Sequence, residues 1–329
     1  MDQPISKRAY HFLKKAGPKS FLRKCWLAVR HRLARRTDEA RDRDELERYH
    51  QKLRSLPISE GHVTVPVLDF QLRLRADDMG LSRELILHGI RERDAVEYLR
   101  PLLPGFRVIL EIGANQGYYA ILEARQTPPE AKIYAFEPHP DNVRTLQLNI
   151  ELNRCAGKFV EVLQGAVSDQ CGTAELNVHG LSNWHSLSRV ELPKGGWQKT
   201  LRVETVTLDE FCRRRGITAV DFVRMDVEGH EAAVVDGAAH ILKLSPACVV
   251  FIELHSGLLR EIGRSSEALL EQMKVLGFTR VTVCGKGRNL PGASLDNLIR
   301  NLELMTEEYG NHLFFFKQPA NHPQSGPET

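Results

Sequence analysis

The sequence predicts an α/β fold built on a doubly wound, mostly parallel sheet. From about residue 107 onward, strand-like and helix-like segments alternate, which is the order of β-α-β crossovers. The strand-like segments RVILEIG and ACVVFIELH are almost wholly apolar, as expected of strands that are covered on both faces. The first of them runs into a glycine-containing turn at Gly113, and sheets of this kind bind ligands beyond the carboxyl ends of their strands.

The elements follow in order along the chain. Residues 62–75 alternate apolar and polar on either side of Leu68-Asp69, which predicts a short β pair, and residues 82–103 have a helical pattern. Strands are then expected at 107–113, 132–138, 159–167, 172–180, 200–206, 221–229, 247–255, 278–283 and 312–318. Helices are expected from about Gly117, at 141–153, 207–216, 230–243, 265–277 and 295–308. The polar loop at 182–200 breaks the rhythm and is suited to face a substrate.

Composition indicates a globular protein. The chain has 329 residues, of which 42% are hydrophobic, and no apolar run approaches the ~18 residues of a membrane span. The amino terminus is charged rather than apolar, so we expect no secretion and a cytoplasmic location. The six cysteines form no CxxC pair, which disfavours a zinc cage or a disulfide framework.

The charge is unevenly distributed and suggests three parts: a basic extension at 1–60, a main domain at 61–317 and a disordered tail at 318–329. Residues 1–55 hold 16 Lys/Arg against 7 Asp/Glu (+9), whereas the rest holds 29 against 35 (−6). Within 18–36, apolar residues including Trp26 fall on one stripe of a helix and basic residues flank it. Such a helix suits an anionic membrane surface, such as the inner membrane face, or packs on its own domain or a partner.

The turn after the first buried strand favours S-adenosylmethionine (SAM) over a dinucleotide. A dinucleotide fingerprint needs glycine at relative positions 1, 3 and 6, which here hold Gly113, Asn115 and Tyr118. Glu111 at the strand end suits a ligand that carries an ammonium group, as SAM does. Ala114 and Gly117 complete the small-residue turn, whose backbone a ligand can approach closely. A turn with a purely structural role is the alternative.

The next two strands supply further cofactor candidates. Glu137 ends the second strand 24 positions after Gly113, where a carboxylate can accept the hydroxyls of a ribose, and Pro138 follows it. After the third strand, Ala166 and Val167 can wall an adenine, while Ser168 offers a hydrogen bond. A tight turn would also account for these small residues.

The fourth strand ends in an acidic group. Asp226 and Glu228 lie on one side of the strand end and would repel each other unless a cation or a donor sat between them. His230 lies nearby, and Glu253 and His255 follow the fifth strand at the same edge of the sheet.

The motifs EIGANQG, FEPHPDNVRTLQLNIELN, LQGAVSD, TLDEF and VRMDVEGHEAAVVDGA occur in the order found in FkbM-type methyltransferases, a class I SAM-dependent family that residues 60 to 317 resemble. The resemblance implies a seven-stranded sheet with SAM over Gly113, Asn115, Gly117 and Glu137. It also implies O-methylation of hydroxyls on sugars, glycans or polyketide-type small molecules. Two departures are Glu111, where the family commonly has Asp, and the basic extension, which lies outside the match.

Methyl transfer to an alcohol needs a positioned acceptor and a base, for which Asp226, Glu228 and His255 are the candidates. A metal is not expected, because the acidic residues lack the His or Asn ligands that would sharpen a site. Two rival functions remain open: nucleic-acid (RNA) methylation, favoured by the basic extension, and a membrane-docked scaffold without catalysis. Against the first, the MDVEG strand end has no aromatic pair to stack a flipped base.

Overall fold

A computed structural model describes residues 42–155, 159–188 and 197–317. The chain divides into two compact units, Met1–Leu56 and Pro57–Thr329. In the first unit, residues 42–54 are helical. The predicted helix at 18–36 and the predicted tail at 318–329 lie outside the described residues. Over the described residues, no helix is both long and apolar enough to cross a bilayer.

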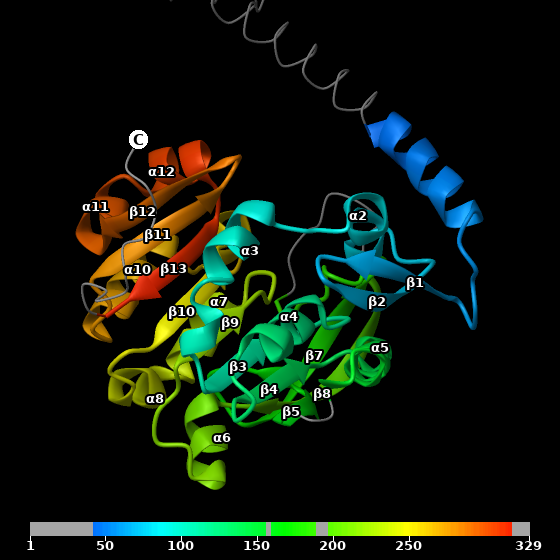
Figure 1. Ribbon diagram of the computed structural model, residues 1–329. Coiled ribbons are helices and arrows are strands. Elements are labelled where there is room, and N and C mark those ends of the chain that lie inside the picture. The colour runs from blue at the N-terminus through cyan, green and yellow to red at the C-terminus, as the bar shows by residue number, and fades with distance from the viewer. Residues whose placement is uncertain (1–41, 156–158, 189–196, 318–329) are drawn as a thin grey trace, which may run out of the picture. The chain divides into compact units, whose positions relative to one another are not determined.

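The second unit contains an eight-stranded central sheet (Figure 1). Its order is β12-β11-β13-β10-β9-β3-β4-β5. The strands β10, β9, β3, β4 and β5 are parallel neighbours, whereas β13 runs antiparallel between β10 and β11. The bounds are β3 (Val108–Ile112), β4 (Lys132–Glu137), β5 (Phe159–Gln164), β9 (Phe222–Met225), β10 (Val249–Glu253), β11 (Arg280–Gly285), β12 (Arg288–Ser294) and β13 (His312–Phe316). The predicted mostly parallel α/β fold is confirmed.

The expected count of seven strands is wrong by one, because β12 pairs with β11 at the edge of the sheet. Residues 286–287 join the two strands in a two-residue hairpin. Lys286 and Gly287 both have positive φ, of 53° and 79°. This geometry suits the twist of a two-residue hairpin, but Lys-Gly lacks the Asn-Gly or Asp-Gly signature that announces it.

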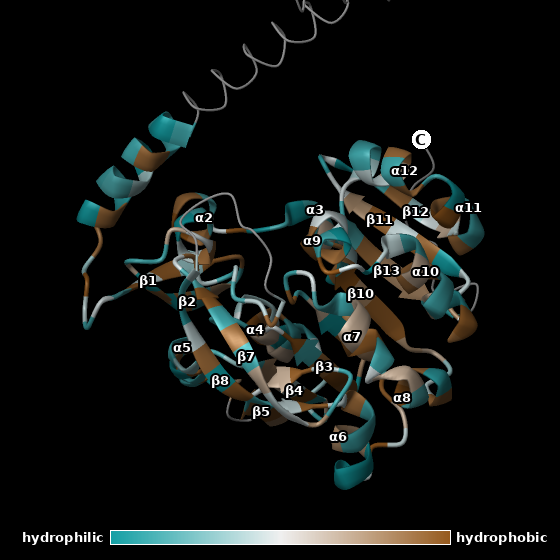
Figure 2. Cartoon of the chain, turned by 180° about the vertical axis from the view of Figure 1, so that it is seen from behind, coloured by the Kyte–Doolittle hydropathy of each residue, from teal (hydrophilic) through white to brown (hydrophobic). Residues whose placement is uncertain are grey.

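Helices cover both faces of the central sheet. In Figure 1, α3 (Arg93–Leu99) and α4 (Tyr118–Gln126) lie in front of it, and in the reversed view of Figure 2, α7 (Glu231–Asp236), α8 (Ala239–Leu244) and α10 (Ser266–Val275) do. Figure 2 shows the strand β10 between them in brown, consistent with its buried, apolar residues. The remaining helices are α5 (Pro140–Leu152), α6 (Leu208–Arg215), α9 (Ser256–Glu261), α11 (Leu295–Arg300) and α12 (Leu302–Tyr309).

Three predicted helices are interrupted, and one of them, at 295–308, divides at Asn301 into α11 and α12. The segment 82–103 forms α2 (Leu81–His88), α3 and a short 3-10 helix, η1 (Leu103–Gly105), because Gly89 adopts a left-handed conformation and ends α2. The segment 230–243 bends at Gly237 between α7 and α8. A Cβ on Gly237 would lie 2.0 Å from the carbonyl oxygen of Ser168, so the bend allows a close backbone contact.

A hairpin and a small sheet flank the central sheet. The predicted β pair is confirmed as β1 (His62–Val67) and β2 (Phe70–Arg75), which pair antiparallel. The small sheet has the order β6-β8-β7, from β6 (Ala166–Val167), β7 (Gly172–His179) and β8 (Trp197–Val206).

The free edge of β2 is closed by amide side chains. Asn153, which caps the carboxyl end of α5, and Asn149 of α5 each exchange two hydrogen bonds with the backbone of β2, at Gln71 and Arg73 respectively. The Gln116 side-chain carbonyl accepts a third contact from the Arg75 N–H at 3.0 Å. We call Gln116, Asn149 and Asn153 the amide ladder. It satisfies the alternate backbone groups of β2 that a further strand would otherwise pair.

Candidate active site

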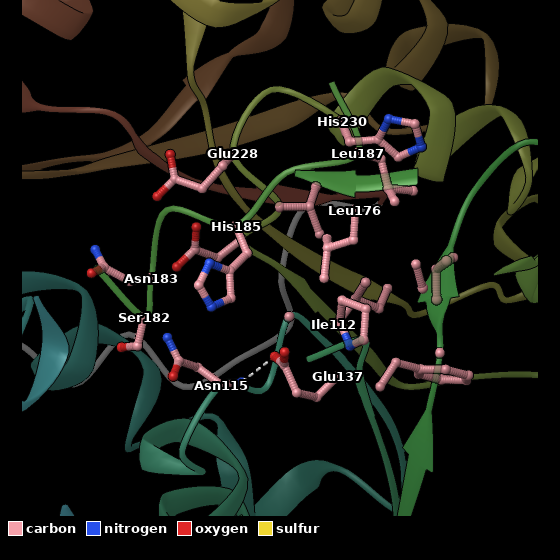
Figure 3. Close-up of a pocket in the computed structure, with 18 residues that line it drawn as sticks. Ile112, Asn115, Glu137, Leu176, Ser182, Asn183, His185, Leu187, Glu228 and His230 are labelled. Carbon is pink, nitrogen blue, oxygen red and sulfur yellow. Dashed lines mark hydrogen bonds between the residues drawn. The ribbon is translucent and has the colours of Figure 1, made fainter. Parts of the chain in front are cut away.

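A pocket lies beyond the carboxyl ends of β3, β4 and β9, where an open sheet gathers its ligands (Figure 3). One wall comes from residues 181–188, which we call the 181–188 loop. The pocket is lined by Ile112, Gly113, Asn115, Phe136, Glu137, Pro138, Gly165, Ala166, Val167, Leu176, Ser182, Asn183, His185, Leu187, Asp226, Val227, Glu228 and His230. The predicted cofactor residue Glu137 thus shares one cavity with the predicted catalytic residues Asp226 and Glu228, whereas His255 does not line it.

The turn after β3 is shaped by protein contacts. Gly113 has a φ of 80°, and a Cβ there would lie 2.1 Å from the carbonyl oxygen of Asp226. Glycine at 113 is therefore required for the end of β9 to pack against the turn. The N–H groups of Gly113 and Ala114 both donate to the Phe136 carbonyl, so the structure does not leave them free for a ligand.

Glu137, which the sequence predicts to bind the cofactor, is held in place by several protein donors. Its carboxylate accepts hydrogen bonds from the N–H groups of Asn115 and His139, each at 2.8 Å, and from the Asn142 amide at 3.3 Å. Burial raises the pKa of Glu137 to about 7, although these hydrogen bonds oppose the rise. Within the part of the chain that the structure describes, one oxygen, Oε2, accepts only the Asn115 contact and can accept another from a ligand.

Glu111 lies behind the pocket in a buried ion pair. Its carboxylate is fully buried and contacts the Arg224 guanidinium at 2.7 Å. That guanidinium also lies 3.7 Å from the centre of the Tyr119 ring and 3.4 Å from Asp226. Burial raises the pKa of Glu111 to about 7 against the opposing effect of Arg224. The structure thus gives Glu111 a protein partner, which the sequence did not reveal.

The acidic end of β9 surrounds a histidine. His255 Nδ1 lies 2.7 Å from Glu231, and Nε2 lies 3.4 Å from Glu228 and 3.7 Å from Glu253. Burial alone would lower the pKa of His255, but Glu228 and its neighbours raise it well above the ordinary value. The raised pKa favours a positive charge beside Glu228, and Asp226 lies 3.4 Å from the Arg224 guanidinium, so each of the two carboxyl groups has a basic neighbour.

Glu228 and Asp226 face the pocket from this cluster. Burial raises the pKa of Glu228 to about 8, and the charge of His255 opposes the rise. Asp226 lines the pocket, and its buried Oδ1 has no hydrogen-bond partner within the described residues.

Four other predicted residues divide between the pocket and its surroundings. Ala166 and Val167 line it, next to Leu176 and Leu187. Ser168 donates instead to, or accepts from, His230 at 2.9 Å. Gly117 caps α4, and a Cβ there would lie 2.6 Å from Leu146. Gly117 and Ser168 therefore act beside the pocket.

Sequence reasoning missed most of the 181–188 loop wall. Ser182, Asn183 and Leu187 line the pocket, although only the polar composition of the segment pointed to a substrate-facing role. In Figure 3, the His185 ring lies between the Glu137 and Glu228 sides of the pocket. Burial lowers the pKa of His185 to about 3, so its ring is neutral.

Among the described residues, two groups of side chains have the spacing of metal ligands. Ligand atoms of Asp226, Glu228 and His255 lie within 4.8 Å of one another, as do those of Glu92, Glu253 and His312. In the first group, the neighbouring carboxyl groups raise the pKa of His255, which disfavours the neutral imidazole that a metal would need. The expectation that no metal is needed stays a prediction.

Comparison with known proteins identifies the family. Residues 111–280 match the methyltransferase FkbM domain. The chain belongs to the FkbM methyltransferase family. The resemblance seen in the motifs is confirmed, although the matched region is shorter than residues 60 to 317.

Three curated relatives illustrate the FkbM family's range. The 2-O-methyltransferase NoeI of Sinorhizobium fredii is 28% identical over 148 residues, which cover 41% of this chain and 58% of NoeI. The hexuronic acid methyltransferase AglP of Haloferax volcanii is 25% identical over 50% of this chain and 63% of AglP. The 31-O-demethyl-FK506 methyltransferase FkbM of Streptomyces tacrolimicus is 29% identical over 48% of this chain and 67% of FkbM. The chain thus spans about three fifths of the length of the first two relatives.

Proposed function

We propose that this protein is a SAM-dependent O-methyltransferase that acts on a hydroxyl of a sugar, a glycan or a polyketide-type small molecule. One observation carries the proposal: Glu137 lines the same cavity as Asp226 and Glu228. A cofactor-binding carboxylate and a proton acceptor must meet in this way if a methyl group is to reach a hydroxyl. Membership of the FkbM family and the activities named for its relatives support the same reaction.

The residues present fit the cofactor. Glu137 keeps an acceptor site on Oε2, and the buried Asn115 Oδ1 has no partner in the described part of the chain. Both atoms suit the donors of a ribose or an amino acid, and the apolar side at Ala166 and Val167 suits an adenine. SAM supplies a methyl group on a sulfonium. Gly113, Ala114, Gly117 and Ser168 would shape the site, with Pro138 at its rim and Glu111 behind it.

The acceptor hydroxyl would be oriented by Asp226 and Glu228. SAM would supply the methyl group and become S-adenosylhomocysteine, and the hydroxyl proton would pass to Asp226 or Glu228. His255 would hold the carboxylates together by its charge rather than act as the base, because its acidic neighbours raise its pKa and so favour the protonated form. Removal of the proton and alignment of the acceptor are thus both assigned to residues at the end of β9.

The test uses the full chain, SAM carrying a labelled methyl group, and hydroxyl-bearing acceptors. The proposal predicts label on a small glycan, glycoside or polyketide-type acceptor, with S-adenosylhomocysteine formed in equal amount. Label that appears only on RNA, and is lost after nuclease treatment, would support nucleic-acid methylation instead. Tight SAM binding without turnover on any acceptor class would favour the scaffold.

We also propose a cytoplasmic protein whose segment 18–36 contacts anionic lipid at the inner membrane face, or a partner. Its support is the basic charge of residues 1–55 and the apolar stripe that includes Trp26. The full chain should float with vesicles rich in phosphatidylserine, and Trp26→Ala should reduce flotation. Equal flotation of the two proteins, or none by the full chain, would refute the membrane contact.

A further inference from the structure

The 181–188 loop is attached to the molecule at two ends of the pocket. At one end, the Ser186 hydroxyl donates to the Glu228 carbonyl at 2.7 Å, and the Ser188 hydroxyl donates to the Gly229 carbonyl at 3.4 Å. At the other end, Ser182 is buried and bonded to Asp78. The loop therefore bridges the acidic end of β9 and the segment that follows β2.

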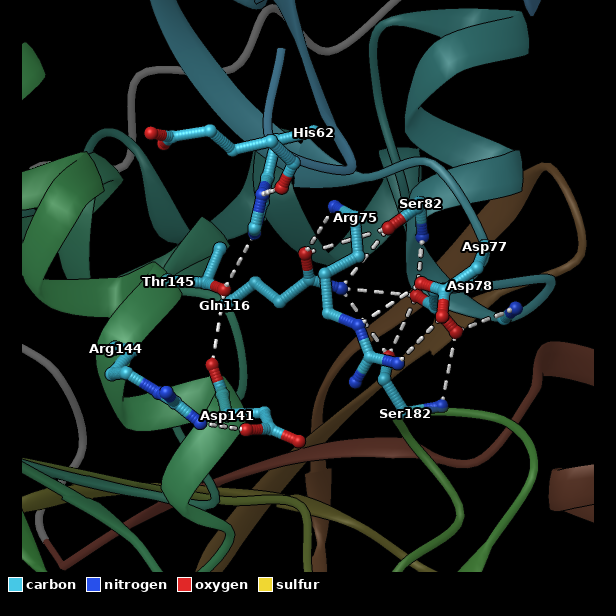
Figure 4. A network of polar contacts seen from close by, with 12 residues as sticks. His62, Arg75, Asp77, Asp78, Ser82, Gln116, Asp141, Arg144, Thr145 and Ser182 are labelled. Atoms are coloured by element: carbon cyan, nitrogen blue, oxygen red, sulfur yellow. Dashed lines mark hydrogen bonds and ion pairs between the residues drawn. The ribbon is translucent and has the colours of Figure 1, made fainter. Parts of the chain in front are cut away.

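Asp78 is the centre of the second attachment (Figure 4). Its Oδ1 accepts from the N–H groups of Gly80 at 3.1 Å and Ser182 at 3.0 Å. Its Oδ2 accepts from the Ser82 N–H at 3.0 Å, the Ser182 hydroxyl at 2.7 Å and the Gln116 amide at 3.0 Å. Five donors thus converge on one carboxylate that is 1% exposed. Burial opposes its charge, but these donors hold the pKa of Asp78 below its ordinary value.

The partners of Asp78 belong to both walls of the pocket. Ser182 lines the pocket on the 181–188 loop, and Gln116 lies in the turn between Asn115 and Gly117. The loop also packs closely on the Asp78 segment, because a Cβ on Gly80 would fall 2.0 Å from Asn183 Oδ1. Asp78 does not itself line the pocket.

We propose that Asp78 is a positioning residue that holds the 181–188 loop as a wall of the SAM pocket and links this wall to the turn after β3. The inference rests on the proposed function, because it assigns the wall to a SAM site. The affinity for SAM would then depend on Asp78, a buried carboxylate outside the pocket. Replacement of this carboxylate would loosen the wall and leave the central sheet in place.

The chemistry of the site makes Asp78→Asn a sharp probe. The asparagine side chain has the same shape as the carboxylate. One of its two polar groups is an NH₂ donor, however, which cannot accept the hydrogen bonds that the carboxylate oxygen at that position now accepts. Asp77→Asn is the matched control. Asp77 is adjacent, its side chain is exposed, and it contacts Arg75 on the surface at 3.1 Å.

The fluorescence of Trp184, which lies between Ser182 and His185, reports on the 181–188 loop directly. In a Trp26→Phe, Trp197→Phe background, acrylamide quenching of Trp184 reports how open the loop is. Calorimetry gives the affinity for SAM, and steady-state assays separate KM for SAM from kcat. Asp78→Asn should increase quenching and weaken SAM binding about tenfold, with KM rising more than kcat falls, whereas Asp77→Asn should change none of these.

If Asp78→Asn does not fold, the variants Ser182→Ala and Ser182→Thr test the same inference. Ser182→Ala removes the 2.7 Å hydrogen bond and keeps the backbone one, so it should produce the same changes in weaker form, and Ser182→Thr should restore the original behaviour. Lower thermal stability with unchanged quenching and unchanged SAM affinity would overturn the inference. A wild-type protein that does not bind SAM would refute the proposed function, whereas quenching of the unliganded variants would still test the attachment of the loop.

Discussion

Glu137 combines a structural role with a proposed binding role in one side chain. Its carboxylate closes the turn after β3 through Asn115, and the same carboxylate borders the pocket. Burial places its pKa at about 7, so its charge changes within the physiological range. A ligand hydroxyl that donates to Glu137 binds best when the carboxyl group is ionised.

Glu137→Ala should weaken SAM binding about 10- to 150-fold, the effect of losing a hydrogen bond to a charged group worth ~1.5 to 3 kcal/mol. Wild-type affinity should also rise as pH increases from 6 to 8, and Glu137→Gln should remove most of this rise. Calorimetry at three pH values measures both effects. Unchanged affinity in Glu137→Ala, with the fold intact by circular dichroism, would place SAM elsewhere.

The carboxylates at the end of β9 should govern turnover more than cofactor binding. A positioned base contributes ~10² to 10⁴ in rate, so Asp226→Asn or Glu228→Gln should reduce kcat by such a factor with little change in SAM affinity. His255→Ala should also reduce kcat, because it leaves Glu228 and Glu231 without their cation.

Single-turnover methyl transfer with the true acceptor measures these effects. Glu175→Gln, which alters an exposed carboxyl group of β7, is the control. If all three variants retained near-normal rates, the proton would have to leave through another group, such as His185.

The sequence predicted which side chains lie together at the site, but it did not predict the partner of each side chain. The carboxyl ends of parallel strands share one edge, so Glu137, Asp226 and Glu228 could be placed together from their positions. The Glu111–Arg224 pair and the imidazolium state of His255 depend on three-dimensional neighbours from different strands. No spacing along the chain encodes those contacts.

Among the elements, the β1–β2 hairpin shows how a hairpin outside the central sheet is attached to the rest of its domain. The amide ladder joins β2 to α5 and to the turn after β3. Each contact replaces a backbone partner that a third strand would have provided.

Asn149→Ala should lower the free energy of unfolding by ~1 to 3 kcal/mol, because partly buried backbone groups at Arg73 would lose their partners. Asn153→Ala should cost less, since its contacts with Gln71 are exposed to water that can replace them. Urea titrations of the two variants give the comparison. An equal or larger loss for Asn153→Ala would contradict this account of the ladder.

The sequence predicted which segments are helices or strands better than it predicted where a helix or strand is interrupted. Buried apolar strands and long amphipathic segments carry strong periodic signals, and both sheet and hairpin were predicted on that basis. The break at Gly237 follows from its contact with Ser168, which lies far away in sequence. The strand β12 was missed because its burial is only partial and its turn lacks a familiar signature.

For the whole molecule, buried ionisable groups predict a loss of stability on the alkaline side. Burial raises the pKa of Glu111 and Glu137 to about 7 and that of Glu228 to about 8, above the ~4.3 of an unfolded chain. The folded state therefore holds protons that the unfolded state has released. Their contribution to stability is complete below the unfolded pKa and is lost as pH rises through 7 and 8.

The melting temperature should accordingly fall between pH 6.5 and pH 8.5. Below pH 6.5, buried histidines with lowered pKa, such as His185, act in the opposite direction and obscure the trend. Differential scanning calorimetry of the wild type and of Glu228→Gln tests the assignment, and the variant should show a shallower fall. A melting temperature that rises over this range would contradict it.

The amide ladder also bears on how copies of this protein behave when crowded. A bare strand edge offers a template on which a neighbouring chain can extend a sheet, and such growth leads to aggregates. Three side chains occupy the hydrogen-bonding groups of β2 and leave a neighbouring chain nothing to pair with along that edge. The residues that hold the β1–β2 hairpin in place therefore also keep the edge of β2 from pairing with another chain.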